Sequence, residues 1–483
     1  MQPLERILER FEQISAVPRG TKHEAGIRAW LADWAEAHGF ASKVDDVGNI
    51  VIQVPASAGY EGEPPVVLQG HMDMVWQKTS DSDHDFTRDP IRVIREGDWL
   101  HADRTTLGAD NGIAIAFMLA VAEDPGLHHP PLEFLLTVEE EVGFTGVFGI
   151  QRGMIIGTTL INLDSEEDGV LTLGCAGGCT LFIDLPVEWE PAGTGDAFIR
   201  IHVGGLRGGH SGGDINKHRA SANKVLARAL ALAEGETPIR LCSLKGGTVR
   251  NAIPREAEAV FACPQGSAVS IRERLAAFGE TVRQEYALTD GGLWLRLDQA
   301  ERVDRAVSEA DTRKIIGFLR VVPNGVSEMS AEMEGFVETS NSVGIIELLE
   351  DGFHAVSSHR SAVGSRLEEI TSRTEALAWL IGAQTRRNAM TQPWQPDYSS
   401  PLLKRCMEVY ESCFGQPPKL ELTHGGLECG VLSSRVGPLD TISLGPTITN
   451  PHSPDESLFV PSVAHTWEFL TALLASFRNA PNG

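Results

Sequence analysis

Side chains able to bind metal ions are spread along most of the chain. In order they are His71, Asp110, Glu141, Asp164 and His452. Imidazole and carboxylate groups suit Zn²⁺, and they also suit Mn²⁺ or Co²⁺. A set of this size could hold two metal ions, which is the arrangement of a hydrolase that works with a metal-activated water.

His71 lies in the segment VVLQGHMDMV, whose apolar residues 66–68 predict a buried strand that ends near Gly70. In extended chain, residues two apart share a face. Asp73 can therefore accept the second N–H of His71 and fix its tautomer, as partners of metal-bound histidines do. A His-x-Asp pair also arises by chance, so this motif alone does not establish a metal site.

The segment LEFLLTVEEEVG predicts a strand over residues 132–138 that delivers Glu139, Glu140 and Glu141 at its tip. Adjacent carboxylates repel one another unless positive charge lies among them. Two of them can serve one site only where the alternation of the strand breaks, leaving one as ligand and its neighbour as a free carboxylate. The alternative is a solvated acidic strand end.

The other candidates are individually ambiguous. Asp110 lies between a glycine-rich turn and an apolar helix, so it could simply cap that helix. Asp164 closes an apolar strand, where aspartate often serves a turn, and His452 lies in a loop, where it could be solvated. However, ligands of parallel sheets gather outside the carboxyl ends of the strands. Several such strand tips follow one another here, which favours a common site.

The chain resembles the co-catalytic zinc aminoacylase and carboxypeptidase superfamily, and within it the bacterial aminoacyl-histidine dipeptidases. The resemblance covers essentially the whole chain. It is carried by the motifs GHMDMV, TLGADNG, TVEEEVG, LINLDSEEDG, GCAGG, GLRGGHSGGDI, RNAIPRE, SSHRSAV, HGGLECG and NPHSPDE.

The resemblance implies that His71, Asp110 and Asp164 hold one metal ion, and that Asp110, Glu141 and His452 hold the other. Asp110 would then bridge the two ions, next to a cis peptide bond with Asn111. The resemblance also makes Glu140 the general base and Asp73 the acid that orients His71.

Further roles are implied for residues of a lid domain. His210 matches a histidine that reaches the oxyanion of the tetrahedral intermediate. Asn251 and Arg360 match residues that hold the substrate, with Arg360 forked onto its C-terminal carboxylate, as guanidinium geometry favours. The HGGLECG loop, including His424 and Gly425, is expected to shape the pocket.

These residues support a definite chemistry. Two cations roughly 3.5–4 Å apart polarise the scissile carbonyl and lower the pKa of a bridging water. Glu140 would take the proton from that water and return it to the leaving amine. The expected substrate is an unblocked dipeptide, often Xaa-His and including β-Ala-His. A deacylase of N-acyl amino acids or a tripeptidase would share every ligand.

Two functions of other classes compete with this hypothesis. Residues 209–213 satisfy the G-x-S-x-G pattern of serine hydrolases, with Ser211 as nucleophile. That pattern needs a strand directly before the serine and a helix directly after it, whereas glycines surround it here. A catalytically inactive binding protein would be expected to have lost the base or a ligand, yet all of them are present.

Composition narrows the partners and the compartment. The net charge of −25 argues against nucleic acid or an anionic membrane as partner. No apolar run is long enough for a membrane span, and the N-terminus predicts an amphipathic helix rather than a signal peptide. The odd number of cysteines without paired spacing predicts reduced thiols and a cytoplasmic protein: Cys175, Cys179, Cys242, Cys263, Cys406, Cys413 and Cys429.

A chain of 483 residues is too long for one core. We expect an α/β catalytic domain with a mixed, mostly parallel sheet flanked by helices, formed by residues 1–180 and 391–483. An inserted α+β lid domain is expected over 181–390, and a proline-rich segment, TQPWQPDYSSP, marks the return to the catalytic domain.

Within the first catalytic segment, helices are expected at about 4–14 and 24–38. In the lid, strand 197–204, helix 216–233, strands 238–245 and 256–263, helix 270–285 and strand 292–298 form a ferredoxin-like βαββαβ unit. Residues 311–385 raise the hypothesis of a second, similar half, which no sequence repeat supports. The lid is long enough to dimerise or to supply His210 within one chain, and a homodimer is the favoured state.

Overall fold

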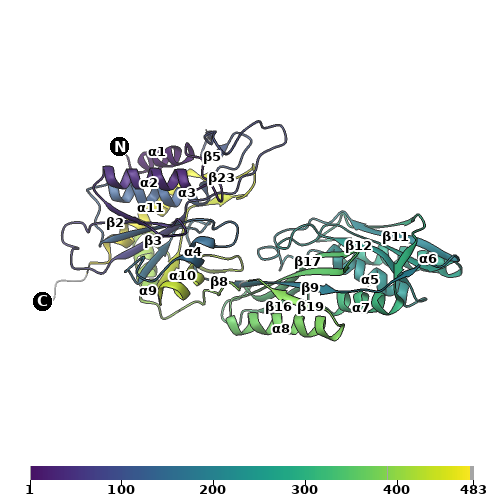
Figure 1. Cartoon of the computed structure of the whole chain (residues 1–483). Coiled ribbons are helices and arrows are strands. Elements are labelled where there is room, and N and C mark those ends of the chain that lie inside the picture. Colours follow the sequence, from purple (N-terminus) through teal and green to yellow (C-terminus); the bar gives the residue numbers. More distant parts are fainter. Residues whose placement is uncertain (1, 389, 479–483) are drawn as a thin grey trace. The chain divides into compact units, whose positions relative to one another are not determined.

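The computed structural model describes residues 2–388 and 390–478 and divides the chain into two compact units (Figure 1). The first comprises Met1–Gly174, Trp394–Leu422 and Leu427–Gly483, and the second comprises Cys175–Pro393 and Thr423–Gly426. The sequence-based boundaries were 180/181 and 390/391. The return of residues 423–426 to the second unit was not anticipated.

The first unit is built on a mixed sheet whose central strands are parallel. Its spatial order is β1 (Ala41–Val44), β2 (Ile50–Val54), β6 (Leu132–Thr137), β3 (Val66–His71), β7 (Thr159–Asn162), β21 (Asp440–Ser443), β8 (Val170–Cys175) and β20 (Lys419–Thr423). Strand β3 runs parallel to β6 and β7, and β7 runs parallel to β21. The carboxyl ends of β6, β3 and β7 therefore lie along one edge.

Helices cover the faces of this sheet: α1 (Pro3–Ser15), α2 (Ala25–Ala37), α3 (Ala109–Glu123), α4 (Thr145–Gly149), α9 (Pro401–Phe414), α10 (Cys429–Val436) and α11 (Val460–Ala475). In Figure 1, α1, α2 and α3 lie on one side and α4 and α10 on the other. Because both faces are covered, β3 and β6 are buried at every position. Helix α3 is likewise apolar on all sides.

A small sheet in the first unit joins segments far apart in the sequence. Its order is β22 (Ile448–Thr449), β23 (Ser457–Phe459), β5 (Trp99–Ala102) and β4 (Val93–Glu96). The hairpin-like pair β22 and β23 encloses the loop that contains His452. This sheet anchors that loop to the segment just before Asp110.

The second unit contains the expected ferredoxin-like fold. The elements β11 (Asp196–Gly204), α5 (Ala222–Glu234), β12 (Arg240–Gly246), β13 (Ala257–Pro264), α6 (Ala268–Glu285) and β14 (Trp294–Gln299) follow one another, with strand order β14-β11-β13-β12. The prediction that α5 begins at residue 216 was wrong. Asp290 accepts the N–H groups of Arg207 and Ala220 at 2.7 Å each, which holds the chain in an irregular path up to Ser221.

A second half of the same topology completes this unit. It consists of β9 (Gly177–Leu185), α7 (Glu309–Val321), β17 (Val337–Leu349), β18 (Gly352–Ser361), α8 (Gly364–Leu380) and β19 (Gln384–Arg387), in strand order β19-β9-β18-β17. The first half is inserted after β9, which explains why no repeat is visible along the sequence. Short strands β10 (Trp189–Pro191), β15 (Arg305–Val307) and β16 (Gly325–Met329) decorate the unit.

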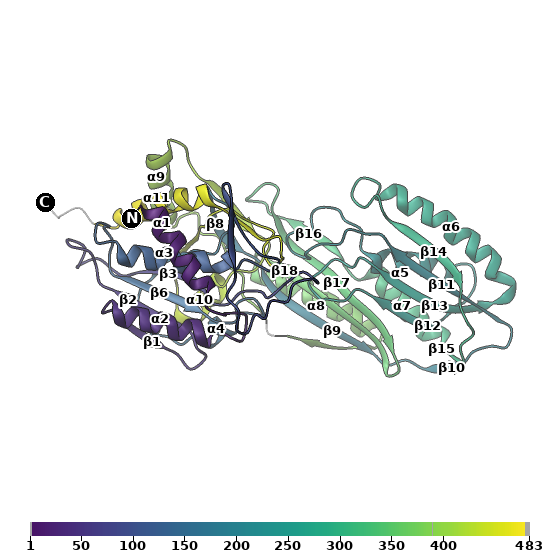
Figure 2. The same ribbon diagram turned by 90° about the horizontal axis from the view of Figure 1, so that it is seen from above.

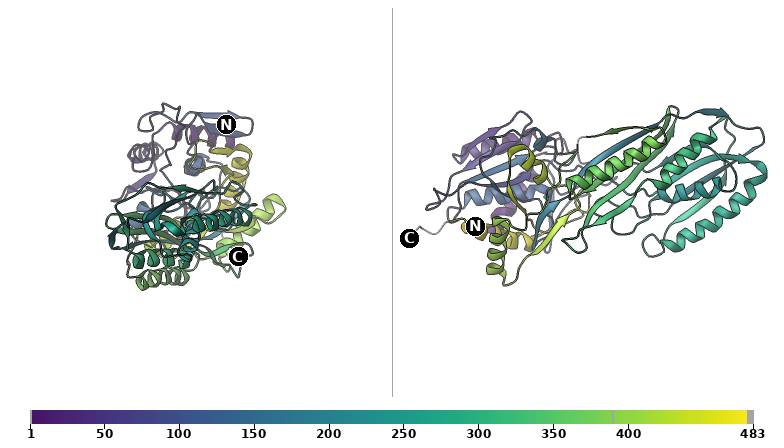
Figure 3. Two further views of the ribbon diagram at one scale, coloured as in Figure 1. Left: turned by 90° about the vertical axis from the view of Figure 1, so that its right-hand side faces the viewer. Right: turned by 90° about the horizontal axis from the view of Figure 1, so that it is seen from below.

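The two halves share one continuous sheet and one core. Strands β12 and β17 pair antiparallel, with Gly246 opposite Ile346, and β17 and β18 run side by side beyond them (Figure 2). Helix α8 lies along the strands of the second half, as the green helix in the right panel of Figure 3 shows. Apolar residues from all four main helices of the unit and from both halves of the sheet form a single buried cluster.

The junction between the halves generates a stability prediction. Gly247 follows β12 with φ +70°, and a Cβ there would lie 1.8 Å from the carbonyl oxygen of Gly344. Gly247→Ala should lower the free energy of unfolding by roughly 1–3 kcal/mol, measured by urea denaturation. Gly266→Ala, where a Cβ meets nothing within 4 Å, is the control. Equal unfolding midpoints for the two variants would contradict this account of the junction.

Candidate metal centre

His71 is the last residue of β3, and Asp73 follows it in the adjoining loop. Asp73 Oδ1 lies 3.3 Å from His71 Nδ1, the contact expected from the spacing, and the same nitrogen lies 3.1 Å from the Asp73 carbonyl oxygen. Both side chains are buried. With Nδ1 held as a donor, Nε2 of His71 is left to face the carboxylates beyond the strand end.

Asp73 also organises the acidic tip that follows β6. Its Oδ1 accepts the N–H of Glu140 at 3.1 Å, and its Oδ2 accepts the N–H of Glu141 at 3.3 Å and the hydroxyl of Thr21 at 3.0 Å. Glu139 has φ +51°, so the alternation of the strand breaks at this residue. Its N–H donates to Glu24. This break lets consecutive glutamates serve the same region.

Asp110 lies at the start of α3, where φ −78° and ψ 107° depart from helical values, and its peptide bond to Asn111 is cis. Its two carboxylate oxygens contact different groups. Oδ1 lies 3.0 Å from His71 Nε2, which is itself 3.4 Å from Asp164 Oδ1. Oδ2 lies 2.9 Å from His452 Nε2, which is 3.0 Å from Glu141 Oε2.

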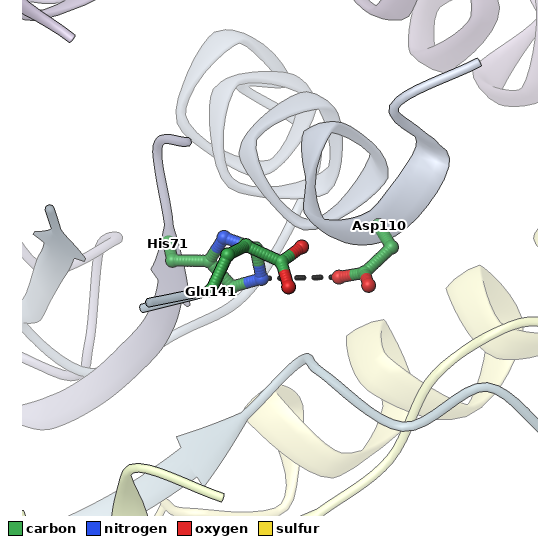
Figure 4. Close-up of side chains that lie close together, drawn as sticks. All are labelled: His71, Asp110 and Glu141. Carbon is green, nitrogen blue, oxygen red and sulfur yellow. Dashed lines mark hydrogen bonds and ion pairs between the residues drawn. The ribbon is translucent and has the colours of Figure 1, made fainter. Parts of the chain in front are cut away.

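The structure therefore sorts the five candidate ligands into two groups that share Asp110. Figure 4 shows His71, Asp110 and Glu141 turned toward one another, with the contact between His71 and Asp110 dashed. Each of these three residues offers an atom within 4.8 Å of the others. The N-cap position of α3 is occupied by Gly108, not by Asp110, and among the described residues the two Asp110 oxygens contact histidines instead.

Like charge crowds this centre. Burial and the charge of Asp110 raise the pKa of Glu141 to about 7. Burial, opposed by His71 and reinforced by Asp164 and Glu141, raises the pKa of Glu140 well above its ordinary value. Conversely, burial is outweighed at His452, where hydrogen bonds with Asp110 and Glu141 raise its pKa to about 11. Protons on these side chains thus partly offset the negative charge of the crowded carboxylates.

The donor set fits divalent cations. Imidazole nitrogens and carboxylate oxygens are Zn²⁺ ligands, and metal binding replaces protons on such groups. Glu141 Oε1 is buried with no hydrogen-bond partner, although a buried carboxylate oxygen is costly to leave unsatisfied. A cation between Glu141, Asp110 and His452 would satisfy that oxygen and relieve the repulsion.

A second cluster lies wholly within the second unit, around Gly212. A Cβ at Gly212 would lie 2.9 Å from the carbonyl oxygen of His424, 3.1 Å from the His210 ring and 3.2 Å from Arg360 Nε. Arg360 Nη2 lies 3.5 Å from His210 Nε2. Arg360 forms no ion pair within residues 2–388 and 390–478, and its Nε has no hydrogen-bond partner there. This guanidinium group is therefore poised for an anion.

Neighbouring residues complete the cluster. His424 Nε2 lies 2.7 Å from Ser340 Oγ, and burial together with Arg360 lowers the pKa of His424 to about 3, so its ring is neutral. Gly425 N–H donates to Thr423 Oγ1. The carbonyl oxygen of Asn251 accepts the N–H of Ser211, and residue 252 bridges to His210.

The surroundings of Ser211 do not match a serine nucleophile. Strand β11 ends at Gly204 and helix α5 begins only at Ala222, so neither element adjoins the serine as the G-x-S-x-G turn requires. Its side chain is buried. The structure therefore agrees with the sequence in arguing against Ser211 as a nucleophile.

Three buried charged residues beside the metal centre were not identified from sequence. Glu456 accepts backbone N–H groups around Asp110, Arg19 donates to carbonyl groups near Asp73, and Glu428 Oε2 accepts from Gln69 Nε2 and Thr137 Oγ1 at 2.6 Å each. Glu428 and Glu456 belong to the motifs HGGLECG and NPHSPDE. Those motifs carried the resemblance, but only the three-dimensional contacts reveal which groups Glu428 and Glu456 bind.

Comparisons with known proteins agree across the chain. Residues 201–290 match the model of a peptidase dimerisation domain. The cytosol non-specific dipeptidase of Escherichia coli K12 is 40% identical over 464 residues, which is 96% of each chain. The crystal structure of the aminoacylhistidine dipeptidase of Vibrio alginolyticus superposes with a TM-score of 0.86 at 37% identity, covering 98% of this chain and 96% of that one.

More distant structures share the fold alone. An aminopeptidase from Bacillus cereus superposes with a TM-score of 0.57 at 17% identity, covering 99% of each chain. The expected fold class, an α/β catalytic unit with an α+β lid, is confirmed by the V. alginolyticus structure. Because its similarity to the bacterial dipeptidases, at 40% and 37% identity, extends over nearly the whole chain, the chain belongs to the M20 family of metallopeptidases.

Proposed function

We propose that this enzyme hydrolyses unblocked dipeptides, with Xaa-His substrates including β-Ala-His as the preferred class, by means of two divalent metal ions. The observation that carries the proposal is that the two carboxylate oxygens of Asp110 face different groups. One oxygen lies beside His71, which contacts Asp164, and the other lies beside His452, which contacts Glu141. A metal-dependent deacylase of N-acyl amino acids and a tripeptidase of the same family remain the alternatives.

The metal ligands in this proposal are His71, Asp110, Glu141, Asp164 and His452, with Asp110 shared. Zn²⁺ is the proposed metal, and the same donors would accept Mn²⁺ or Co²⁺. Asp73 holds the tautomer of His71 and, through the N–H groups of Glu140 and Glu141, the backbone of the acidic tip.

Bound at this site, two divalent cations would polarise the scissile carbonyl and lower the pKa of the attacking water. Glu140, which makes no ion pair with either candidate histidine among the described residues, takes a proton from the attacking water. The carbonyl carbon gains the oxygen of that water, the C–N bond breaks, and Glu140 returns the proton to the leaving amine. His210 donates to the oxyanion of the tetrahedral intermediate.

Arg360 is proposed to bind the free C-terminal carboxylate of the substrate. Its support is a guanidinium group that lies among His210, Gly212 and His424 and has no ion-pair partner within the described residues. Asn251, His424 and Gly425 line the same cluster and are proposed to shape the pocket. His210 and Arg360 come from different halves of one lid, so a single chain suffices to bring them together.

Assembly and location are also proposals. A homodimer is supported by the match of residues 201–290 to a peptidase dimerisation domain. A cytoplasmic location is supported by the name of the E. coli relative. Within the described part of the chain, we find no helix with the length and hydropathy needed to span a membrane.

The substrate proposal is tested by the release of free histidine from Ala-His and β-Ala-His, with N-acetyl-His as the blocked control. Metal-loaded enzyme should cleave only the free dipeptides, lose activity on chelation and regain it with Zn²⁺ or Mn²⁺. Cleavage of N-acetyl-His alone would instead make the enzyme a deacylase. Activity that resists chelation would support a serine hydrolase with Ser211 as nucleophile.

Glu140→Gln tests the general base. Because the amide cannot accept the proton, kcat should fall by about 10²–10⁴-fold or more while two metal ions stay bound. Glu139→Gln is the matched control from the same acidic tip and should keep its activity. A Glu140→Gln enzyme that retains bound metal and a kcat within about tenfold of wild type would exclude this role.

Arg360→Lys tests recognition of the carboxylate. Lysine keeps the charge but loses the fork, so KM for Ala-His should rise by about tenfold or more, whereas turnover of Ala-His amide should change little. Arg386→Lys, at an exposed arginine of the same unit, serves as the control. An equal effect on the free acid and the amide would show that Arg360 does not bind the carboxylate.

A further inference from the structure

The segment that leads into Asp110 is held by a single buried carboxylate. Glu456 Oε2 accepts the N–H groups of Leu107 at 2.8 Å and Gly108 at 2.9 Å, and its Oε1 accepts those of Ala109 at 2.8 Å and Asp110 at 3.3 Å. Four consecutive peptide groups are thereby tied to one side chain. Glu456 is only 2% exposed, so solvent does not compete for these bonds.

A buried arginine holds the same segment by its carbonyl side. Arg19 donates to the carbonyl oxygens of Met72 at 3.1 Å and Asp73 at 3.0 Å, and through Nη2 to that of Gly108. Arg19 is 1% exposed. A Cβ at Gly108 or Gly112 would lie 2.7 or 2.5 Å from Nη2, so these two glycines make room for the guanidinium group.

The contacts join three remote parts of the chain that each carry candidate ligands. Arg19 connects the loop after His71 to the loop before Asp110. Glu456 lies four residues after His452, and its own N–H donates to Ser453. Arg19 and Glu456, from opposite ends of the chain, thus hold the backbone next to candidate ligands of both metal groups.

The pair also balances charge beside the metal centre. Burial lowers the pKa of Arg19, and this effect is opposed by Glu456 first, then by Asp73, Asp110 and Glu141. A fixed positive charge so close to the ligands would repel metal ions unless a carboxylate compensated it. Because burying a charged side chain is costly, a role at the adjacent site explains why both side chains lie here.

We propose that Arg19 and Glu456 form a positioning pair that sets Asp110 and His71 in ligand geometry before metal binds, and thereby determines the metal affinity of the centre. This inference rests on the proposed metal-dependent function. Neither residue is assigned a contact with metal or substrate. Their effect passes through the peptide groups of residues 72–73 and 107–110.

The test is the dissociation constant for Zn²⁺, measured on the full-length apo-protein by competition with a chelator of known affinity. Glu456→Gln removes the charge and two acceptor sites, and it should weaken Zn²⁺ binding by about 10–100-fold, the range for loss of a group that supports a ligand. Asp455→Asn removes one charge from the same loop at an exposed side chain and should leave the constant within about twofold of wild type.

Activity gives a second reading. At limiting Zn²⁺ the Glu456→Gln enzyme should be less active than wild type, and raising Zn²⁺ should restore its turnover, which a general loss of folded protein would not allow. Far-UV circular dichroism and the midpoint of thermal unfolding in chelator establish that the apo-variant is folded. If it is not, Glu456→Asp, which keeps the charge but shortens the reach, takes its place with the same expected weakening.

The possible outcomes distinguish failure of the positioning role from failure of the metal-dependent dipeptidase function. A folded Glu456 variant with wild-type Zn²⁺ affinity, or an equal loss in Asp455→Asn, would overturn the positioning role and leave the dipeptidase proposal intact. A wild-type protein that binds no Zn²⁺, Mn²⁺ or Co²⁺ would instead remove the metal centre itself.

Discussion

Repulsion among buried carboxylates governs the design of this protein. Asp110, Glu140, Glu141 and Asp164 converge with His71 and His452 at one edge of a sheet, where burial and mutual charge raise the pKa values of Glu140, Glu141 and Asp164. Such a set is unfavourable without positive charge among its members. The surrounding structure makes sense as the scaffold that keeps these groups together until cations neutralise them.

Apart from the contact of Asp73 with the His71 ring, that scaffold works by fixing backbone. Parallel strands β6, β3 and β7 bring three ligand-bearing loops to one edge. Asp73, Arg19 and Glu456 then tie peptide groups of those loops to one another. Below them Glu428 bonds with Gln69 and Thr137 on β3 and β6. Ionisable side chains are thus used in the interior where strand ends must be aligned.

The second unit applies a different principle. Two ferredoxin-like halves joined through β12 and β17 form one continuous sheet, and the cluster of His210, Arg360 and His424 draws residues from both halves. Its electrostatics are the opposite of those at the metal centre. An arginine without an ion-pair partner among the described residues and a neutral histidine favour an anionic group, as a dipeptide carboxylate would provide.

Much of this arrangement was predictable because it depends on local pattern. Apolar runs ending in His71, Glu139–Glu141 and Asp164 indicated strand tips, and the contact of Asp73 with His71 followed from their spacing. The ferredoxin-like strands were also predicted closely. The start of α5 was not, because Asp290, seventy residues away, decides it. Arg19 and Glu456 were missed for the same reason, since their partners lie far along the chain.

The central claim is that Asp110 is shared between two metal ions, and anomalous diffraction from crystals of the Zn²⁺-loaded enzyme tests it most directly. The account predicts two anomalous peaks, both in contact with Asp110, one also touching His71 and Asp164 and the other Glu141 and His452. A single peak, or two peaks of which only one contacts Asp110, would contradict it.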